Sequence, residues 1–433
     1  MTHAEIVRVH GRRVWDSRGR PTVEVDITLA DGALGRAIAP AGASTGSGEA
    51  LDRRDGGASF GGFDVTNAVA SVNTEIARSL VGQDALDQAA IDARLIALDG
   101  TANKSRLGGN AIVATSMAAM HARAAAQHLP LWKALAGDNP VRLPLPEIQI
   151  FGGGAHAARR VDVQDFMIMC PGARTFSQAL DWTAEVYRAA GAILKKAGKI
   201  QGVADEGGYW PAFASNEEAL DTLVKSIEDA GFVPGNDIGI SLDIAASEFR
   251  KDGYYVLALD GKKLDTSAML DMLTRWMATY PIFSIEDPVA EDDPEGFIEF
   301  TRRHGKACQV IGDDFLVTNA SRVDKAAGDK ALNAVLIKPN QAGTMTETHA
   351  ALSAGKAAGF GTIVSARSGE TEDTTIVDLA VGWNAGQLKV GSFTRSERMA
   401  KWNACLRIEE ELGAEAEFAG WLALPFSRVK RRG

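Results

Sequence analysis

The chain has 433 residues, of which 45% are hydrophobic and 24% are charged; this balance is usual for a globular protein and excludes wholesale disorder. The length exceeds that of one ordinary compact domain, so we expect two. Acidic residues outnumber basic ones by 56 to 46, which gives a net charge of −10. This charge repels phosphate backbones and anionic lipid, so we expect neither nucleic acid nor a membrane as a partner.

The cysteines and the N-terminal segment indicate a cytoplasmic protein. Cys170, Cys308 and Cys405 are widely spaced and form no CxxC pair, which is typical of buried thiols in a reducing compartment. The N-terminus lacks an apolar signal core, and no stretch reaches the roughly 18 apolar residues of a membrane span. The basic end, RVKRRG, is expected to be solvated.

The first part of the chain is expected to form an antiparallel sheet followed by helices. Apolar and polar residues alternate over residues 20–38 around an Asp31-Gly32 turn, which predicts a hairpin. The apolar period then changes to three and four residues, which predicts helices over 64–80, 84–98 and 110–128. A Gly- and Pro-rich cluster follows near residue 140. We therefore expect an N-terminal α+β domain over 1–138 and a second domain over 139–433.

Beyond this cluster, short β-rich segments alternate with helical ones, as in IGISLDI, IFSIEDP, QVIGDD, NAVLIKPN, TIVSARS and QLKVGS. Strands that read as apolar runs are typical of parallel sheets covered on both faces. The α/β repetition and the length available fit a closed parallel barrel ringed by helices better than an open sheet.

Charged or polar residues stand at the ends of these apolar runs: Asp243, Glu286, Asp313, Lys338, Arg367 with Ser368, and Lys389, with Glu206 placed similarly after GVADEGG. In a barrel of this kind such positions converge at one mouth, where active sites lie. Three carboxylates cannot all stay ionised at one point without a compensating cation. All-oxygen ligation favours Mg²⁺ or Mn²⁺ over Zn²⁺.

The two lysines have two interpretations. A lysine beside a metal ion has its ammonium form disfavoured, so Lys338 or Lys389 could act as a base. Alternatively, either lysine could simply pair with the carboxylates. A metal, a lysine base and a separate carboxylic acid together indicate removal of a proton next to a carboxylate, followed by loss of a leaving group.

Long strings along the whole chain resemble the enolase family. They include WDSRGRPTVEV, GASTGSGEAL, DEGGY, SLDIAASEF, GDDFLVTN, LIKPNQAGTMTET and RSGETEDTTIVDLAVG. The resemblance implies an enolase-type (β/α)8 barrel that carries the active site, capped by the N-terminal α+β domain. It also implies a homodimer or a higher homo-oligomer, and a Mg²⁺-dependent hydro-lyase acting on a small phosphorylated or phosphonylated carboxylate.

The resemblance further implies two Mg²⁺ ions per active site. Asp243, Glu286 and Asp313 would hold the tighter ion. Ser44, in the GASTG loop, would complete a second site that fills when substrate binds.

The remaining roles implied by the resemblance concern the substrate. Lys338 would abstract the C2 proton, and Glu206 would assist departure of the C3 hydroxyl. Lys389 would bind the substrate carboxylate, while Arg367 and Ser368 would grip the phosphoryl group. His156, in GGGAHA, matches a loop histidine near the phosphoryl end, although a loop-packing role is the alternative.

Three residues depart from the family pattern around the expected pocket. Ala366 stands where the family has histidine, Asp165 replaces a catalytic-site glutamate, and Phe151 replaces an asparagine. Ala366 removes a donor and vacates volume at the substrate end, whereas the metal triad and the lysine base are intact. Arg159 and Arg160 could add positive charge there, or could be a solvated pair.

Three functional hypotheses follow. The departures favour a paralogue that keeps the dehydration but accepts an enlarged substrate, similar to carboxyphosphonoenolpyruvate synthase of phosphonate biosynthesis. The alternatives are an ordinary glycolytic enolase that converts 2-phosphoglycerate to phosphoenolpyruvate and tolerates the changes, or a catalytically silent binding paralogue.

Overall fold

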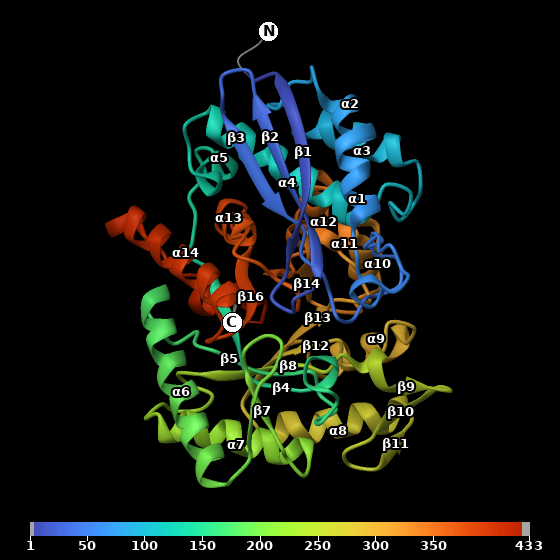
Figure 1. Ribbon diagram of the computed structural model, residues 1–433. Helices are drawn as coiled ribbons and strands as arrows, with labels where there is room; N and C mark the ends of the chain where they lie inside the picture. Colours follow the sequence, from blue (N-terminus) through green and yellow to red (C-terminus); the bar gives the residue numbers. More distant parts are fainter. Residues whose placement is uncertain (1–3, 427–433) are drawn as a thin grey trace.

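The computed structural model describes residues 4–426, apart from the side chains of His156 and Gln201. The basic end, residues 428–433, lies outside the described residues. An N-terminal antiparallel sheet is formed by β1 (Ile6–Trp15), β2 (Pro21–Leu29) and β3 (Leu34–Ile38), in that order. The predicted hairpin is β2 with β3, in which Val25 pairs with Ala37. Figure 1 shows this sheet above the second, larger part of the molecule.

The predicted N-terminal helices are present, with one interruption. The first runs through α1 (Thr66–Ser71), a π-helical turn η2 (Val72–Ile76) and α2 (Ala77–Leu80). It is followed by α3 (Gln88–Asp99), α4 (Gly109–Ala126) and the short α5 (Leu131–Ala136). Helix α4 is largely buried because it packs against β2 and β3 and also contacts α11 (Pro339–Ala342) and α12 (Met345–Ala357) of the second part. We propose the domain division after residue 138, between α5 and β4.

Within residues 4–426, eight strands close into a barrel, since the last strand also pairs with the first. The barrel strands are β4 (Leu145–Gly152), β5 (Asp165–Met169), β8 (Gly239–Asp243), β12 (Ile282–Glu286), β13 (Gln309–Gly312), β14 (Ala334–Ile337), β15 (Gly361–Ser365) and β16 (Gly386–Ser392). A second hairpin of β6 (Ile200–Val203) and β7 (Tyr209–Pro211) is attached to β4. A small three-stranded sheet of β9 (Arg250–Lys251), β10 (Tyr254–Leu257) and β11 (Lys262–Leu264) follows β8.

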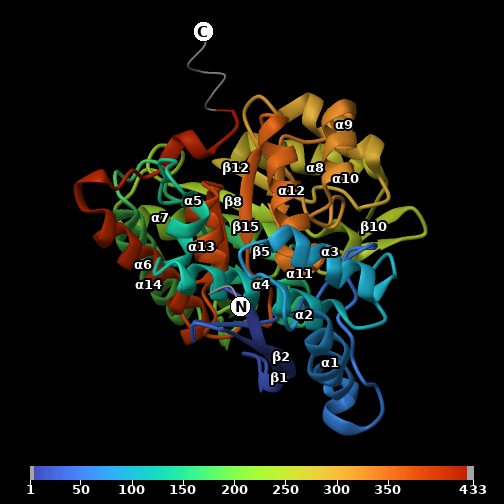
Figure 2. The same cartoon turned by 90° about the horizontal axis from the view of Figure 1, so that it is seen from above.

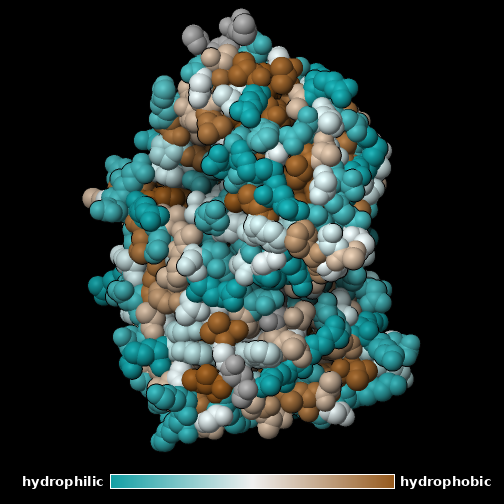
Figure 3. Space-filling view, viewed as in Figure 1, coloured by the Kyte–Doolittle hydropathy of each residue, from teal (hydrophilic) through white to brown (hydrophobic). Residues whose placement is uncertain are grey.

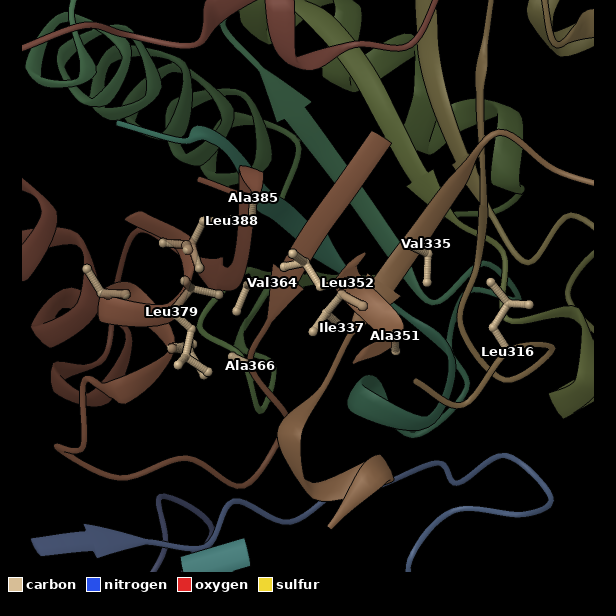
Figure 4. Packing of buried hydrophobic residues seen from close by; sticks show 14 of the residues in the cluster. Leu316, Val335, Ile337, Ala351, Leu352, Val364, Ala366, Leu379, Ala385 and Leu388 are labelled. Carbon is tan, nitrogen blue, oxygen red and sulfur yellow. The ribbon is translucent and has the colours of Figure 1, made fainter. Parts of the chain in front are cut away.

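Helices cover the outside of the barrel. They are α6 (Phe176–Lys196), α7 (Asn216–Asp229), α8 (Thr266–Thr279), α9 (Pro294–His304), α10 (Ala320–Asp329), α12, α13 (Thr375–Gly382) and α14 (Ser396–Leu412). Seen from above, α6 and α14 lie on one side and α9 and α10 on the other (Figure 2). Figure 4 shows the packing that joins the layers: Val335, Val364 and Leu388 of the barrel strands pack with Leu352 of α12 and Leu379 of α13.

The expectation of a wholly parallel barrel is wrong for one strand. β5 runs antiparallel to both β4 and β8. The segment between Gly152 and Asp165 contains only the short 3₁₀ turn η3 (Gly154–Ala157), and a parallel return needs a longer crossover, usually a helix. As a result the first residue of β5, Asp165, lies level with the last residue of β8, Asp243. The antiparallel strand therefore brings its beginning to the same mouth as the ends of its neighbours.

The opposite end of the barrel is covered by residues 419–426. Leu145, at the start of β4, and Met169, at the end of β5, form a hydrophobic cluster with Ala423, Leu424 and Phe426. This leaves the carboxyl-end mouth for the N-terminal domain, which caps it through contacts such as the backbone N–H of Ile38 donating to Asp373 at 2.8 Å.

The surface shows a mixed distribution of side chains. On the face in Figure 3, hydrophobic patches are separated by hydrophilic residues. Among residues 4–426, no helix has both the length and the apolar character needed to cross a bilayer.

Candidate active site

The predicted carboxylates converge at the barrel mouth. Asp243 and Glu286 end adjacent parallel strands and occupy paired positions in the sheet, while Asp313 directly follows β13. The Lys389 ammonium lies between the first two, with its Nζ 3.0 Å from Asp243 Oδ2 and 2.7 Å from Glu286 Oε2. Lys338 forms a buried ion pair with Asp313. Sequence spacing thus predicted the groups that meet here, although Lys389 is a mid-strand residue of β16, level with the end of β15.

A cavity open to solvent lies at this mouth; about 330 Å³ of space, part of it open solvent, lies within its bounds. Its lining combines the barrel strands with the N-terminal domain: Ala43, Ser44, Gln164, Asp165, Glu206, Asp243, Lys338, Ser365, Ala366, Arg367, Ser368, Lys389, Val390 and Gly391. Most of the predicted site residues therefore share one enclosure.

Several buried charged groups lie close together at the mouth and shift one another's pKa values. Burial and then the nearby Asp243 raise the pKa of Glu286 well above its usual range. Burial opposes ionisation of Asp313, but the Lys338 ammonium outweighs it and lowers the pKa of Asp313. Burial likewise disfavours the ammonium of Lys389, but Asp243 and Glu286 outweigh it and raise the pKa of Lys389 well above the ordinary value. Both lysines thus pair with carboxylates in this structure, Lys338 with Asp313 and Lys389 with Asp243 and Glu286.

The donor set fits a hard divalent cation. Glu286 Oε1 is buried and has no hydrogen-bond partner among the described residues, so one carboxylate oxygen remains for a ligand. Asp243 and Asp313 add further anionic oxygens at the same mouth. Such an all-oxygen set suits Mg²⁺.

Glu206 reaches the cavity from outside the barrel wall. The expectation that it ends a barrel strand is wrong, because it lies in the turn between β6 and β7. Its backbone carbonyl accepts a hydrogen bond from Ser392 N at 2.9 Å. A Cβ on Gly391 would lie 3.0 Å from Glu206 Cβ, and Gly391 has a φ of +111°, so glycine is required for this close approach.

Arg367 and Ser368 follow β15, which lies across the barrel from β8 and its Asp243. Arg367 Nη2 donates to the backbone carbonyl of Ser44 at 2.8 Å. Ser368 Oγ accepts from the backbone N–H of Ala43 at 3.1 Å. Ser44 is thus held at the mouth by its backbone.

The three departures from the family pattern have different surroundings. Phe151 is fully buried, packs edge-to-face on Phe213 at 5.2 Å between ring centroids, and is not among the described residues that line the cavity. Ala366 does line the cavity but is only 7% exposed and belongs to the hydrophobic cluster (Figure 4). Asp165 is buried, accepts from Gln149 Nε2, and lies 3.5 Å from Lys389 Nζ.

The loop that carries His156 is only partly informative, because the His156 side chain lies outside the described residues. Arg159 pairs with Glu248 at 2.9 Å, and Arg160 lies over the Trp210 ring at 5.0 Å. Neither arginine lines the cavity among the described residues, so the hypothesis that they add charge to it has no support here.

Several residues that position the site were missed from the sequence. Gln164 donates to Asp243 Oδ2 at 3.0 Å. Asp287 accepts backbone N–H groups of Asp313 at 2.9 Å and Asp314 at 3.0 Å, which fixes the turn after β13. The only available signal was adjacency: Gln164 precedes Asp165, Asp287 follows Glu286, and Asp314 follows Asp313.

Glu147 of β4 is buried inside the barrel, and we expect it to make the stability of the fold depend on pH. Burial raises its pKa from 4.5 to about 7, although Ser241 Oγ donates to it at 3.0 Å. Between pH 4.5 and about 7, Glu147 is largely deprotonated in the unfolded chain but still protonated in the folded protein. The free energy of unfolding therefore falls as pH rises through this window, by roughly 3 kcal/mol in total. Glu147→Gln should therefore unfold at higher urea than the wild type at pH 8 and at a similar concentration at pH 4. An equal difference at both values would contradict the assignment.

A barrel mouth with buried carboxylates, an adjacent lysine and a separate acid is typical of metal-dependent lyases that remove a proton next to a carboxylate. Comparisons with known proteins identify the family within this class. A model described as "Enolase, C-terminal TIM barrel domain" matches residues 140–424, and one described as "Enolase, N-terminal domain" matches 6–135. The chain belongs to the enolase family and is a carbon–oxygen hydro-lyase.

Curated relatives agree over nearly the full length. The chain is 52% identical over 417 residues to "Enolase 1" of Desulfitobacterium hafniense (strain Y51), covering 96% of this chain and 95% of the relative. It is 49% identical over 422 residues to "Enolase" of Acidothermus cellulolyticus, covering 98% of each. It is 48% identical over 419 residues to "Enolase" of Tropheryma whipplei (strain Twist), covering 96% and 97%.

Proposed function

We propose that this protein converts 2-phosphoglycerate to phosphoenolpyruvate and water. The observation that carries the proposal is the near full-length identity of about half to relatives named enolase, in a chain whose mouth gathers two lysines and three carboxylates. The homodimer implied by the resemblance is part of this proposal.

The residues of the mouth have distinct proposed roles. Lys338 takes the C2 proton, and Glu206, in its acid form, protonates the departing C3 hydroxyl. Lys389 binds the substrate carboxylate, while Arg367 and Ser368 hold the phosphoryl group at the opposite side. Asp165 orients Lys389 through their 3.5 Å contact.

Asp243, Glu286 and Asp313 would hold one Mg²⁺, and Ser44 would contribute to the second. When bound, Mg²⁺ supplies positive charge that stabilises the substrate dianion and offsets the carboxylates around Lys338. In the structure, burial opposes the ammonium of Lys338, but Asp313 raises its pKa. Separation of Lys338 from Asp313 is therefore what frees the amine to accept a proton.

The ordinary enolase alternative has more support than the enlarged-substrate hypothesis. Relatives of 48–52% identity are named enolase, and none of these names points to phosphonate biosynthesis. Phe151 packs in the core, and the Ala366 methyl lies against apolar neighbours. Two of the three departures thus have a packing explanation that needs no larger substrate.

Parallel turnover assays distinguish the two substrates. The wild type should turn over 2-phosphoglycerate at least roughly tenfold faster than its carboxyphosphono analogue, because an added carboxylate would have to be desolvated beside buried Ala366. Ultraviolet absorbance of the enol product reports the rate. Faster turnover of the analogue, lost selectively on Ala366→His, would restore the enlarged-substrate hypothesis.

A further inference from the structure

Glu49 is a buried carboxylate that joins the 42–50 loop to the barrel. The loop carries Ser44 and comes from the N-terminal domain. Glu49 Oε1 accepts the backbone N–H of Gly46 at 3.0 Å, and Glu49 Oε2 lies 3.1 Å from Arg367 Nη1. Both partners of this ion pair are almost completely buried, with side-chain exposures of 3% for Arg367 and 7% for Glu49. A buried pair of this kind is costly to break on one side only.

The loop rests directly on the Arg367 guanidinium. Besides Glu49, Arg367 donates to Asn340 Oδ1 at 3.0 Å and to the Ser44 carbonyl at 2.8 Å. A Cβ on Gly42 would lie 2.0 Å from Arg367 Nη2, so the loop backbone packs against the guanidinium without room for a side chain. The position of the loop and the orientation of the arginine therefore depend on each other.

Glu49 also connects to the proposed metal ligands through Gln341. Gln341 Nε2 donates to Glu49 Oε1 at 3.2 Å and to Asp313 Oδ1 at 2.9 Å. Its Oε1 accepts from Thr318, whose hydroxyl in turn accepts the backbone N–H of Lys338 at 2.9 Å. Glu49 and Gln341 together thus link the loop and Arg367 to Asp313, the carboxylate beside Lys338.

A separate anchor holds the tip of the loop. Ser47 donates to Glu291 from both its backbone N–H and its hydroxyl at 2.9 Å, and Arg322 donates to the Ser47 carbonyl at 2.9 Å. These contacts face α9 and α10 and do not include Arg367. Loss of the Glu49 carboxylate would therefore loosen the base of the loop while the tip contacts persist.

We propose that Glu49 is a positioning residue that couples the seating of the 42–50 loop to the orientation of Arg367. Anything that holds Arg367 in place stabilises the seated loop, and a seated loop holds Arg367, because coupling between two sites is reciprocal. Resting on the function proposed above, this means that phosphoryl binding at Arg367 and placement of Ser44 are linked through one carboxylate.

Glu49→Gln tests the coupling, since it keeps the volume but removes the charge of the ion pair. Amide hydrogen exchange of residues 42–50, followed by mass spectrometry without substrate, should accelerate roughly tenfold. The KM for 2-phosphoglycerate should rise by a similar factor while kcat changes less. Glu299→Gln, which breaks an exposed ion pair with Arg302 on α9, is the matched control and should change neither quantity.

The outcomes are separable from the proposed function. Unchanged exchange in Glu49→Gln overturns the inference whatever happens to turnover, and faster exchange with an unchanged KM overturns the link to phosphoryl binding. Absence of 2-phosphoglycerate turnover in the wild type would instead defeat the proposed function, and the exchange experiment would still decide the loop coupling. If Glu49→Gln does not fold, Glu49→Asp, which keeps the charge but shortens its reach, should show faster exchange of the same segment; unchanged exchange there would also overturn the inference.

Discussion

Replacing Lys338 with alanine is expected to lower turnover of 2-phosphoglycerate by roughly 10²–10⁴-fold, the range usual for loss of a general base. The variant should also stop exchange of the C2 proton with solvent, because Lys338 is the group proposed to take this proton. Incubation in deuterated water followed by NMR reports this exchange directly. It separates proton abstraction from later loss of the hydroxyl.

Two further variants make the Lys338 result interpretable. Lys338→Met keeps the length of the side chain, so it tests whether alanine acts through a lost contact rather than a lost amine. Lys325→Ala removes an exposed lysine that pairs with Asp329 within α10, and it should retain wild-type exchange and turnover. Wild-type exchange of the C2 proton in Lys338→Ala would assign the base to another group.

The placement of the central charges was predictable because strand direction fixes it. Asp243, Glu286 and Asp313 each follow an apolar run, and parallel strands deliver their ends to the same mouth. No side-chain detail is needed for that inference. Apolar residues at intervals of three and four predicted the helices of the N-terminal domain, and the alternation of apolar and polar residues predicted the hairpin of β2 and β3.

The antiparallel strand shows where strand patterns fail. β5 reads as an apolar run like its neighbours, and nothing in such a run encodes direction. Direction came instead from the short connection between Gly152 and Asp165, which cannot make a parallel crossover. Glu206 was misplaced for a related reason: its preceding strand, β6, pairs with β7 in a hairpin beside the barrel rather than in the wall.

Positioning residues were missed because their importance depends on three-dimensional neighbours. Glu49 and Arg367 are 318 positions apart in the sequence, and Gln341 approaches both Glu49 and Asp313. Conversely, the sequence placed Phe151 in the pocket, whereas it packs on Phe213 in the core; Ala366 does line the cavity, and it also belongs to the apolar cluster. A substitution read from sequence alone does not reveal whether its side chain faces a cavity or a core.

Removal of divalent metal with EDTA is expected to abolish turnover, and added Mg²⁺ should restore it. Glu286→Gln should then require at least roughly tenfold more Mg²⁺ for half-maximal binding in calorimetry, because it removes an anionic ligand. The buried Oε1 of Glu286, which lacks a hydrogen-bond partner among the described residues, is the atom left for the cation.

A second cluster of acidic residues lies nearby, so the metal prediction can be tested against an alternative site. Carboxylate oxygens of Asp287, Asp313 and Asp314 lie within 4.8 Å of one another, yet Asp287 is already occupied by the backbone N–H groups of the other two. Burial and then Asp313 raise the pKa of Asp314 to about 8, and Asp314 stands one residue past the expected ligand Asp313, in the turn that Asp287 fixes. Asp314→Asn should therefore weaken Mg²⁺ binding less than Glu286→Gln does. The reverse order would move the ion from the trio at Asp243, Glu286 and Asp313 to the turn after β13.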